Sequence, residues 1–151
     1  MSTKFLQNII VSDTSCLIAL TNIKRLELLK ELARSVVITP EVAAEYGLPL
    51  PEWILIKSVA DVSKTERHKT KLHIGEASSI ALAEELRNVL LVLDDAEARK
   101  YAVKFGFNIT GTLGILMLAH RQGLIQNLAT EIEKLRAINF WLPRDVDTLI
   151  R

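Results

Sequence analysis

The sequence is poor in cysteine, proline, glycine and aromatic side chains. Its 151 residues include 1 Cys, 4 Pro and 6 Gly, and only 5% are Phe, Trp or Tyr. A single cysteine, Cys16, excludes an intramolecular disulfide and favours a reducing compartment, so we expect a cytoplasmic protein. The low proline and glycine content excludes collagen-like and low-complexity chains. Aliphatic side chains must therefore fill the core, and Cys16 is expected to be a small buried residue.

The sequence also lacks a long hydrophobic run and a charge of one dominant sign. No stretch reaches the roughly 18 uncharged apolar residues of a membrane span, and residues 1–8 lack the apolar centre of a signal peptide. With 19 Lys and Arg against 18 Asp and Glu, the net charge is +1. The molecule as a whole neither attracts nor repels nucleic acid, so any such contact must come from local patches.

The composition that remains is that of a well-packed globular protein. Of the residues, 49% are hydrophobic and 25% are charged, which excludes an intrinsically disordered chain. The length fits one domain, and we expect a single domain over residues 1–151.

Short apolar runs alternate with helical patterns along the chain. Strands are predicted at 8–11, 36–38, 53–59, 89–93 and 107–110, with a last one at 140–142. Helices are predicted after Asp13, with Thr14 and Ser15 as caps, and then at 26–32, 40–46, 75–87, 96–105, 112–121 and 128–137. Residues 63–73 are predicted to be a long loop or an exposed helix. The alternation predicts an α/β fold, a three-layer sandwich around a mostly parallel sheet.

Acidic residues stand where predicted strands end and helices begin. Asp13 closes the first strand, and Asp94 and Asp95 close the strand at 89–93. Glu76 lies in the first turn of one helix, and Glu45 in the helix begun by Pro40. Ligands of open parallel sheets bind beyond the carboxyl ends of the strands, where these side chains would meet. Clustered carboxylates repel one another, and Mg²⁺ or Mn²⁺ would relieve the repulsion and activate water for phosphodiester hydrolysis.

Each acid taken alone also has a structural interpretation. Asp13 is a common turn residue, and Glu76 complements the dipole of its helix. Asp94 or Asp95 is suited to capping the following helix, and Glu45 to an exposed helix face. The constellation, more than any of its members, favours a metal site.

Five segments resemble the PIN domains, and among these the VapC-type toxins of prokaryotic toxin–antitoxin pairs. Residues 11–15 resemble the first acidic motif of the family, 39–45 the second and 75–78 the third. Residues 91–99 resemble the fourth motif, and 111–114 follow as in one prokaryotic branch. The likeness runs from about Ile9 to about Gly123.

The resemblance implies a ribonuclease that uses Mg²⁺ or Mn²⁺. It implies that Asp13, Glu45, Glu76 and Asp95 hold the metal, with Asp94 as a further candidate ligand. Many relatives carry Asp where this chain has Glu76, and many carry Thr-x-Asp-x-x-Phe where it has residues 93–98. That register favours Asp95 over Asp94. The resemblance also implies an RNA substrate, a homodimer and inhibition by a partner antitoxin.

A basic cluster precedes Glu76 in the sequence. Its cationic members are Lys64, Arg67, Lys69 and Lys71. They are suited to a phosphate-binding rim for RNA beside the metal site, and equally to an ordinary solvated segment. Arg99, four residues after Asp95, is spaced to pair with it along a helix.

Two other functions fit parts of the pattern. A structure-specific DNA nuclease would use the same acids. A non-catalytic phosphoacceptor module resembling response-regulator receivers would carry its paired acids after the first strand, whereas this chain carries Asp94 and Asp95 late. That order disfavours the phosphoacceptor.

Overall fold

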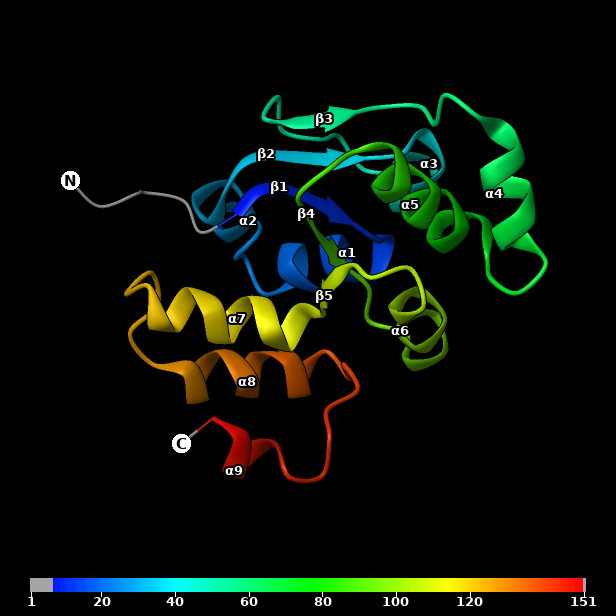
Figure 1. Cartoon of the computed structure of the whole chain (residues 1–151). Coiled ribbons are helices and arrows are strands. Elements are labelled where there is room, and N and C mark those ends of the chain that lie inside the picture. The colour runs from blue at the N-terminus through cyan, green and yellow to red at the C-terminus, as the bar shows by residue number, and fades with distance from the viewer. Residues whose placement is uncertain (1–6, 151) are drawn as a thin grey trace.

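A five-stranded, all-parallel sheet forms the centre of the molecule. The computed structural model describes residues 7–150 (Figure 1). The strands lie in the order β3-β2-β1-β4-β5. Their bounds are β1 Gln7–Ser12, β2 Ala33–Ile38, β3 Ile54–Ile56, β4 Val89–Val92 and β5 Asn108–Thr110. The α/β prediction is confirmed, with β3 shorter than the strand predicted at 53–59.

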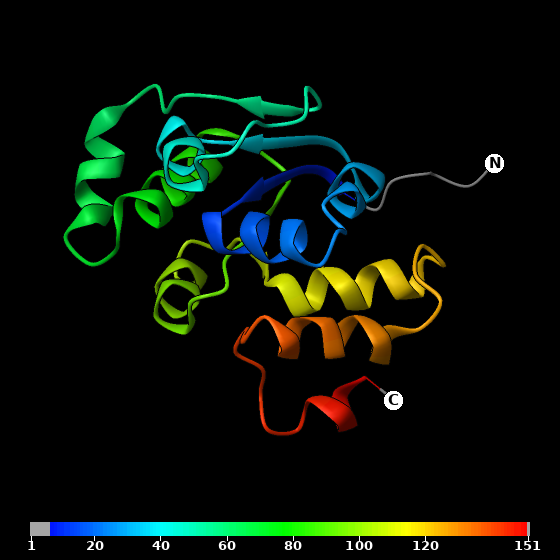
Figure 2. The same cartoon turned by 180° about the vertical axis from the view of Figure 1, so that it is seen from behind.

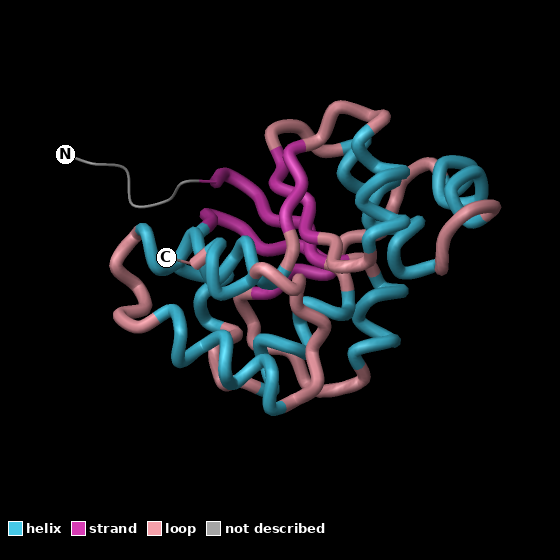
Figure 3. The backbone as a smooth tube through the Cα atoms, turned by 90° about the horizontal axis from the view of Figure 1, so that it is seen from below, coloured by secondary structure: helices cyan, strands magenta, loops and turns pink. Residues whose placement is uncertain are grey.

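Helices cover both faces of this sheet (Figures 2 and 3). Their bounds are α1 Thr14–Asn22, α2 Glu27–Leu32, α3 Pro40–Tyr46, α4 Val62–Lys69, α5 Ile74–Glu85, α6 Ala96–Val103, α7 Thr112–Arg121, α8 Leu128–Ala137 and α9 Val146–Leu149. Side chains alternate along each strand, so Ile10 packs on one face with α1, α2, α7 and α8, while Val11 packs on the other with α5 and α6. The result is the expected three-layer sandwich.

The order of the strands places a topological switch in the middle of the sheet. From β1 the chain continues to β2 and β3 on one side, then returns to β4 and β5 on the other. β1 therefore has β2 and β4 as its neighbours, and Ser12 pairs with Val92 at the carboxyl ends. Ligands of open α/β sheets bind beyond the strands at such a switch point.

Residue chemistry explains where several helices begin and end. Thr39 caps α3 by accepting a hydrogen bond from the Val42 N–H, with Pro40 at the first helical position. Gly47 ends that helix with φ +71°, a left-handed conformation that favours glycine. The cap of α1 differs from the prediction, because Asp13 itself accepts from the Cys16 N–H, and Thr14 and Ser15 lie inside the helix.

Residues 62–69 form α4, whose residues are mostly exposed, so the exposed-helix alternative for 63–73 is confirmed over its first part. Another surface segment differs from expectation. The strand predicted at 140–142 is absent from the described residues, since β5 pairs only with β4 and no strand forms after α8. Its apolar triplet instead follows α8 as irregular chain. Cys16 is fully buried, as expected.

Among residues 7–150, no helix has the length and apolar character needed to cross a membrane.

Candidate active site

The switch point brings Asp13 and Asp94 side by side. Asp13 directly follows β1, and its N–H donates to the Val92 carbonyl of β4 at 3.0 Å. One of its carboxylate oxygens, Oδ2, accepts from the Asp94 N–H at 2.9 Å. The pairing of β1 with β4 thus produces the convergence that the sequence indicated.

Asp13 is the most buried acid of this edge. Its side chain caps α1, its residue is only 4% exposed, and both carboxylate oxygens accept backbone N–H groups. The pKa of Asp13 is raised from 3.8 to about 7, chiefly because burial disfavours the charged form and secondly because of the negative charge of Asp94. The two backbone hydrogen bonds oppose the rise, and the charge of Glu76 adds to it. When no cation is bound nearby, protonation of Asp13 is therefore easier than for an exposed aspartate.

Asp94 is held in place from the end of β5. Its Oδ1 accepts the Thr112 N–H at 2.7 Å, and its Oδ2 accepts the Thr112 hydroxyl at 2.7 Å. The intervening residue, Gly111, leaves the space for this contact. A Cβ at Gly111 would lie 2.8 Å from Asp94 Oδ1 and 3.3 Å from Arg99 Nη1, so a larger residue would displace one of them.

Asp95 and Glu76 form the outer part of the cluster. Asp95 caps α6, its Oδ2 accepting the Ala98 N–H at 2.9 Å, and is exposed. Glu76 lies in the first turn of α5 and is half-buried. Burial raises the pKa of Glu76, and the charge of Asp95 adds to the rise. The adjacent acids therefore have different neighbours, Asp94 facing Asp13 and Asp95 facing Glu76.

Glu45 reaches the cluster from α3 across two other elements. Its Oε1 accepts the Thr14 hydroxyl at 3.0 Å, which ties α3 to the start of α1. A Cβ at Gly75 would overlap the same oxygen, so Glu45 lies directly against the first turn of α5. A buried hydrogen bond between Thr39 and Ser78 at 2.7 Å fixes α3 against α5.

Four of the five predicted acids line one cavity of about 1100 Å³, which is large for a small-molecule site. They are Asp13, Glu76, Asp94 and Asp95. Glu45 lies at the edge of the cluster and does not line the cavity. The rest of the cavity is mostly apolar and extends over α1 and α7 to residues 138–149.

Within residues 7–150, none of the five acids takes part in an ion pair, although other acids of the chain do. No three Asp, Glu, His or Cys side chains of this part of the chain are grouped closely enough to hold one ion together. Magnesium is commonly bound by one or two carboxylates, with waters and substrate phosphates completing the shell. An all-oxygen set of unpaired, mutually repelling carboxylates fits such an ion in its chemistry.

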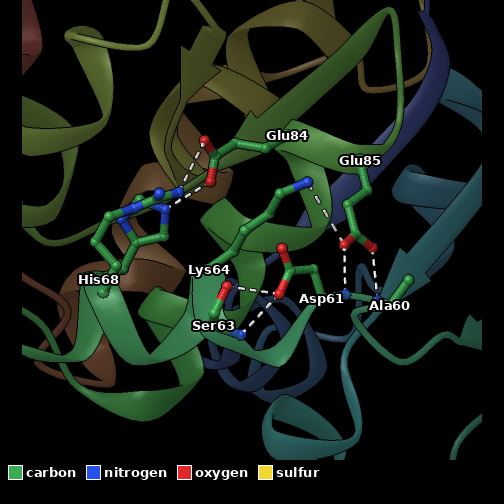
Figure 4. A network of polar contacts seen from close by, with 8 residues as sticks. Ala60, Asp61, Ser63, Lys64, His68, Glu84 and Glu85 are labelled. Carbon is green, nitrogen blue, oxygen red and sulfur yellow. Dashed lines mark hydrogen bonds and ion pairs between the residues drawn. The ribbon is translucent and has the colours of Figure 1, made fainter.

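The basic cluster lies on α4 and in the turn after it, and part of it has a structural role. Lys64 pairs with Glu85 and Arg67 with Glu84, both near the end of α5, as Figure 4 shows for Lys64. Lys69 pairs with Glu66 on its own helix. None of the predicted RNA-binding residues, Lys64, Arg67, Lys69 and Lys71, lines the cavity.

Three functional candidates were missed by the sequence analysis. Thr112 fixes Asp94, and Trp141 lines the apolar part of the cavity. Among the described residues that line the cavity, Arg99 is the one that is cationic. Thr112 follows β5, so the strand-end rule that found Asp13 applied to it as well. Arg99 does not form the ion pair with Asp95 that its spacing suggested. No sequence signal distinguished Trp141.

Comparison with known families decides how this site is classified. The family DUF3368, described as a PIN domain, matches residues 9–150. The chain belongs to the PIN-domain family. A search of the curated proteins finds no match.

PIN domains are typically nucleases and are generally metal-dependent. The match contains all five acids, and it extends past Gly123, where the resemblance of individual motifs ended, to include α8 and residues 138–149. The segment that forms the apolar end of the cavity is thus part of the PIN domain.

Proposed function

We propose that this PIN domain is a divalent-metal-dependent endoribonuclease. The observation that carries the proposal is the convergence of Asp13, Glu76, Asp94 and Asp95 on one cavity without a cationic partner among the described ion pairs. Such an arrangement has a cost in repulsion that a bound Mg²⁺ or Mn²⁺ removes. Glu45 joins the set from the edge of the cluster.

The side chains have separate tasks in this proposal. Asp13, Glu45, Glu76 and Asp95 would hold one or two divalent ions, with Asp94 as a further ligand, and waters and substrate phosphates would complete the coordination of each ion. When bound, the metal supplies Lewis-acid activation of water and charge stabilisation at the phosphodiester. Thr112 keeps the carboxylate of Asp94 oriented, and Thr14 does so for Glu45. Arg99 offers a guanidinium that can donate two parallel hydrogen bonds to a substrate phosphate. Such charge-assisted pairs are among the strongest hydrogen bonds in proteins.

RNA is the proposed substrate because four motifs of the chain resemble ribonuclease toxins of the VapC type. DNA is the competing substrate, since the same acids would cleave it. Incubation of purified protein with a single-stranded RNA and the DNA of the same sequence separates the two. We expect Mn²⁺-dependent cleavage of the RNA, abolished by EDTA and by Asp13→Asn.

The matched control for Asp13→Asn is Glu52→Gln, which removes an exposed acid outside the cavity and should leave the rate unchanged. Faster cleavage of the DNA would assign the alternative substrate. Absence of cleavage of either strand by folded protein with Mn²⁺ or Mg²⁺ would refute the proposed function.

We further propose, from the same resemblance, a cytoplasmic homodimeric toxin that a partner antitoxin inhibits. Expression of the wild-type protein in a bacterial host should arrest growth, whereas Asp13→Asn should not. Light scattering of the purified protein gives its mass, and the mass of one chain alone would refute the homodimer. Growth unaffected by soluble, active protein would refute the toxin role.

A further inference from the structure

The cavity that contains the acids also presents exposed apolar surface. Ile18 on α1, Leu149 on α9 and Trp141 line the cavity and are 41%, 46% and 78% exposed. Single exposed apolar residues are normal on a protein surface. Here three of them share one cavity, and it is the cavity that contains the proposed metal ligands.

The chain holds Trp141 at this position through its two neighbours. After α8, Asn139 adopts φ +60°, and the Phe140 N–H donates back to the Leu135 carbonyl at 3.0 Å. Phe140 and Leu142 are partly buried against the core, whereas Trp141 between them is not part of that packing. With Phe140 and Leu142 anchored on either side, Trp141 is the residue of the three that is exposed.

The same cavity combines three kinds of side chain. The carboxylates lie at the sheet edge, and Arg99 Nη1 and Asp94 Oδ1 both lie next to Gly111. Much of the remaining lining is aromatic or aliphatic. A polymer with anionic phosphates and flat apolar bases matches this combination, because its phosphate would meet the metal and Arg99 while an adjacent base would meet the apolar side chains.

We propose that Trp141 is a positioning residue that stacks on a nucleobase flanking the cleaved phosphodiester, with Arg99 contacting a phosphate of the same strand. The inference rests on the proposed nuclease function and adds the residues that place its substrate. A base stacks on an aromatic side chain only when it is not enclosed in a duplex, so the site selects single strands. Stacking is tolerant of sequence because every base has a flat face.

The first experiment measures stacking without cleavage. The chain has two tryptophans, and Trp53 is partly buried against the core, so Trp53→Phe leaves Trp141 as the sole tryptophan emitter. We expect its emission to be quenched as oligouridine is added in Ca²⁺, which replaces Mn²⁺ to slow hydrolysis. Fluorescence anisotropy of end-labelled oligouridine measures binding in parallel. Binding without a change in Trp141 emission would overturn the proposal.

The second experiment measures the effect on the reaction. Trp141→Ala should raise KM for a single-stranded substrate about 5- to 100-fold, the range expected for loss of one stacked base, with kcat little changed. Trp141→Phe should recover most of the loss because it keeps an aromatic face. Val103→Ala, which truncates an exposed apolar residue outside the cavity, is the matched control. An unchanged KM in folded Trp141→Ala would overturn the proposal.

The outcomes separate this inference from the function on which it rests. Cleavage by the wild type without quenching would refute the stacking role alone. Quenching without cleavage in any metal would refute the nuclease and leave the stacking. Trp141 emission that changes with protein concentration but not with oligouridine would show that a second copy covers the apolar end, which also overturns the inference.

Discussion

At the scale of single residues, Asp94 and Asp95 are neighbours in sequence with different surroundings. Both oxygens of Asp94 accept hydrogen bonds from Thr112, whereas Asp95 is exposed and uses Oδ2 alone to cap α6. Substitution by Asn therefore tests different properties at the two positions. At Asp95 the substitution removes the negative charge and keeps the cap of α6, since Asn caps a helix as well as Asp does. It therefore tests whether cleavage needs the carboxylate.

We expect Asp95→Asn to abolish most Mn²⁺-dependent cleavage at unchanged thermal stability. Asp94→Asn should lower stability by about 1–3 kcal/mol, because its two charge-assisted hydrogen bonds with Thr112 become neutral ones, the amide nitrogen donating to the hydroxyl oxygen. Cleavage rates and thermal denaturation of both variants measure the two effects. A smaller loss of cleavage in Asp95→Asn than in Asp94→Asn would mean that the family register is displaced by one residue.

Gly75 gives a second test at this scale, because its missing side chain leaves room for Glu45. An added Cβ would overlap Glu45 Oε1, the far end of a flexible side chain that swings away at little cost. Gly75→Ala should therefore reduce cleavage about 10-fold or more while changing stability by less than about 1 kcal/mol. The paired control is Glu52→Gln, which changes an exposed acid outside the cavity. Equal cleavage by Gly75→Ala and the wild type would exclude Glu45 from the site.

The buried carboxyl of Asp13 should make the metal-free protein sensitive to pH. Its pKa is raised from 3.8 to about 7 in the folded state, so the folded state binds the proton more tightly than the unfolded state. This contribution to stability is fully present below about pH 4 and is lost as the pH rises through about 7. The raised pKa of Glu76 acts in the same direction.

Thermal denaturation in EDTA between about pH 4 and pH 8 measures this dependence. We expect the component due to Asp13 to be missing from Asp13→Asn, so that the variant loses less stability than the wild type as the pH rises. Parallel curves for the two proteins would show that Asp13 is ionised throughout and that its burial has been overestimated.

At the scale of elements, α4 is bound to α5 by side chains that the sequence presented as one basic cluster. His68 is fully buried, and its Nε2 lies 2.6 Å from a carboxylate oxygen of Glu84 (Figure 4). Its Nδ1 lies 2.7 Å from the Tyr101 hydroxyl. Glu85 accepts the Ala60 and Asp61 N–H groups at the start of α4. Spacing of charges along the chain could not reveal these contacts, because their partners lie on α5 and α6.

The cations of α4 should therefore differ in their effect on RNA binding. Lys69→Ala combined with Lys71→Ala should flatten the slope of log affinity against log salt by about one unit on single strands, as loss of one to two phosphate contacts does. Lys64→Ala combined with Arg67→Ala should leave the slope unchanged and lower stability by about 1 kcal/mol or less. If the slope of log affinity against log salt is the same for all variants and the wild type, none of these cations contacts a phosphate and the basic cluster is an ordinary solvated surface.

Some helices could be predicted from the sequence together with their bounds. α7 and α8 have the predicted bounds, since each is a long amphipathic run with clear ends. The prediction of a strand at 140–142 was wrong, because an apolar run forms a buried strand only where a partner strand exists. Among residues 7–150, no strand pairs with the outer side of β5. Phe140 and Leu142 still pack against the core, and Trp141 between them is exposed. Burial therefore alternates along this triplet without any pairing to another strand.

At the scale of the whole molecule, the strand order determines the site. The sequence indicated that Asp13 and Asp94 end strands, and the adjacency of β1 and β4 completes the argument by bringing those ends together. The apolar end of the cavity could not be predicted, because it depends on the return of residues 138–149 towards α1 from the far end of the chain. The pattern of residues within a segment does not indicate which distant element that segment packs against.

The proposed nuclease activity depends most on the binding of a divalent metal by the unpaired carboxylates. Calorimetric titration of Mn²⁺ into wild-type protein and into Asp13→Asn tests this directly, with circular dichroism to confirm that the variant is folded and Glu52→Gln as the matched control. We predict that the wild type and Glu52→Gln bind Mn²⁺ alike and gain thermal stability with it, while Asp13→Asn binds at least about 10-fold more weakly. Equal affinity of folded Asp13→Asn and the wild type, or no binding by the wild type, would contradict the account.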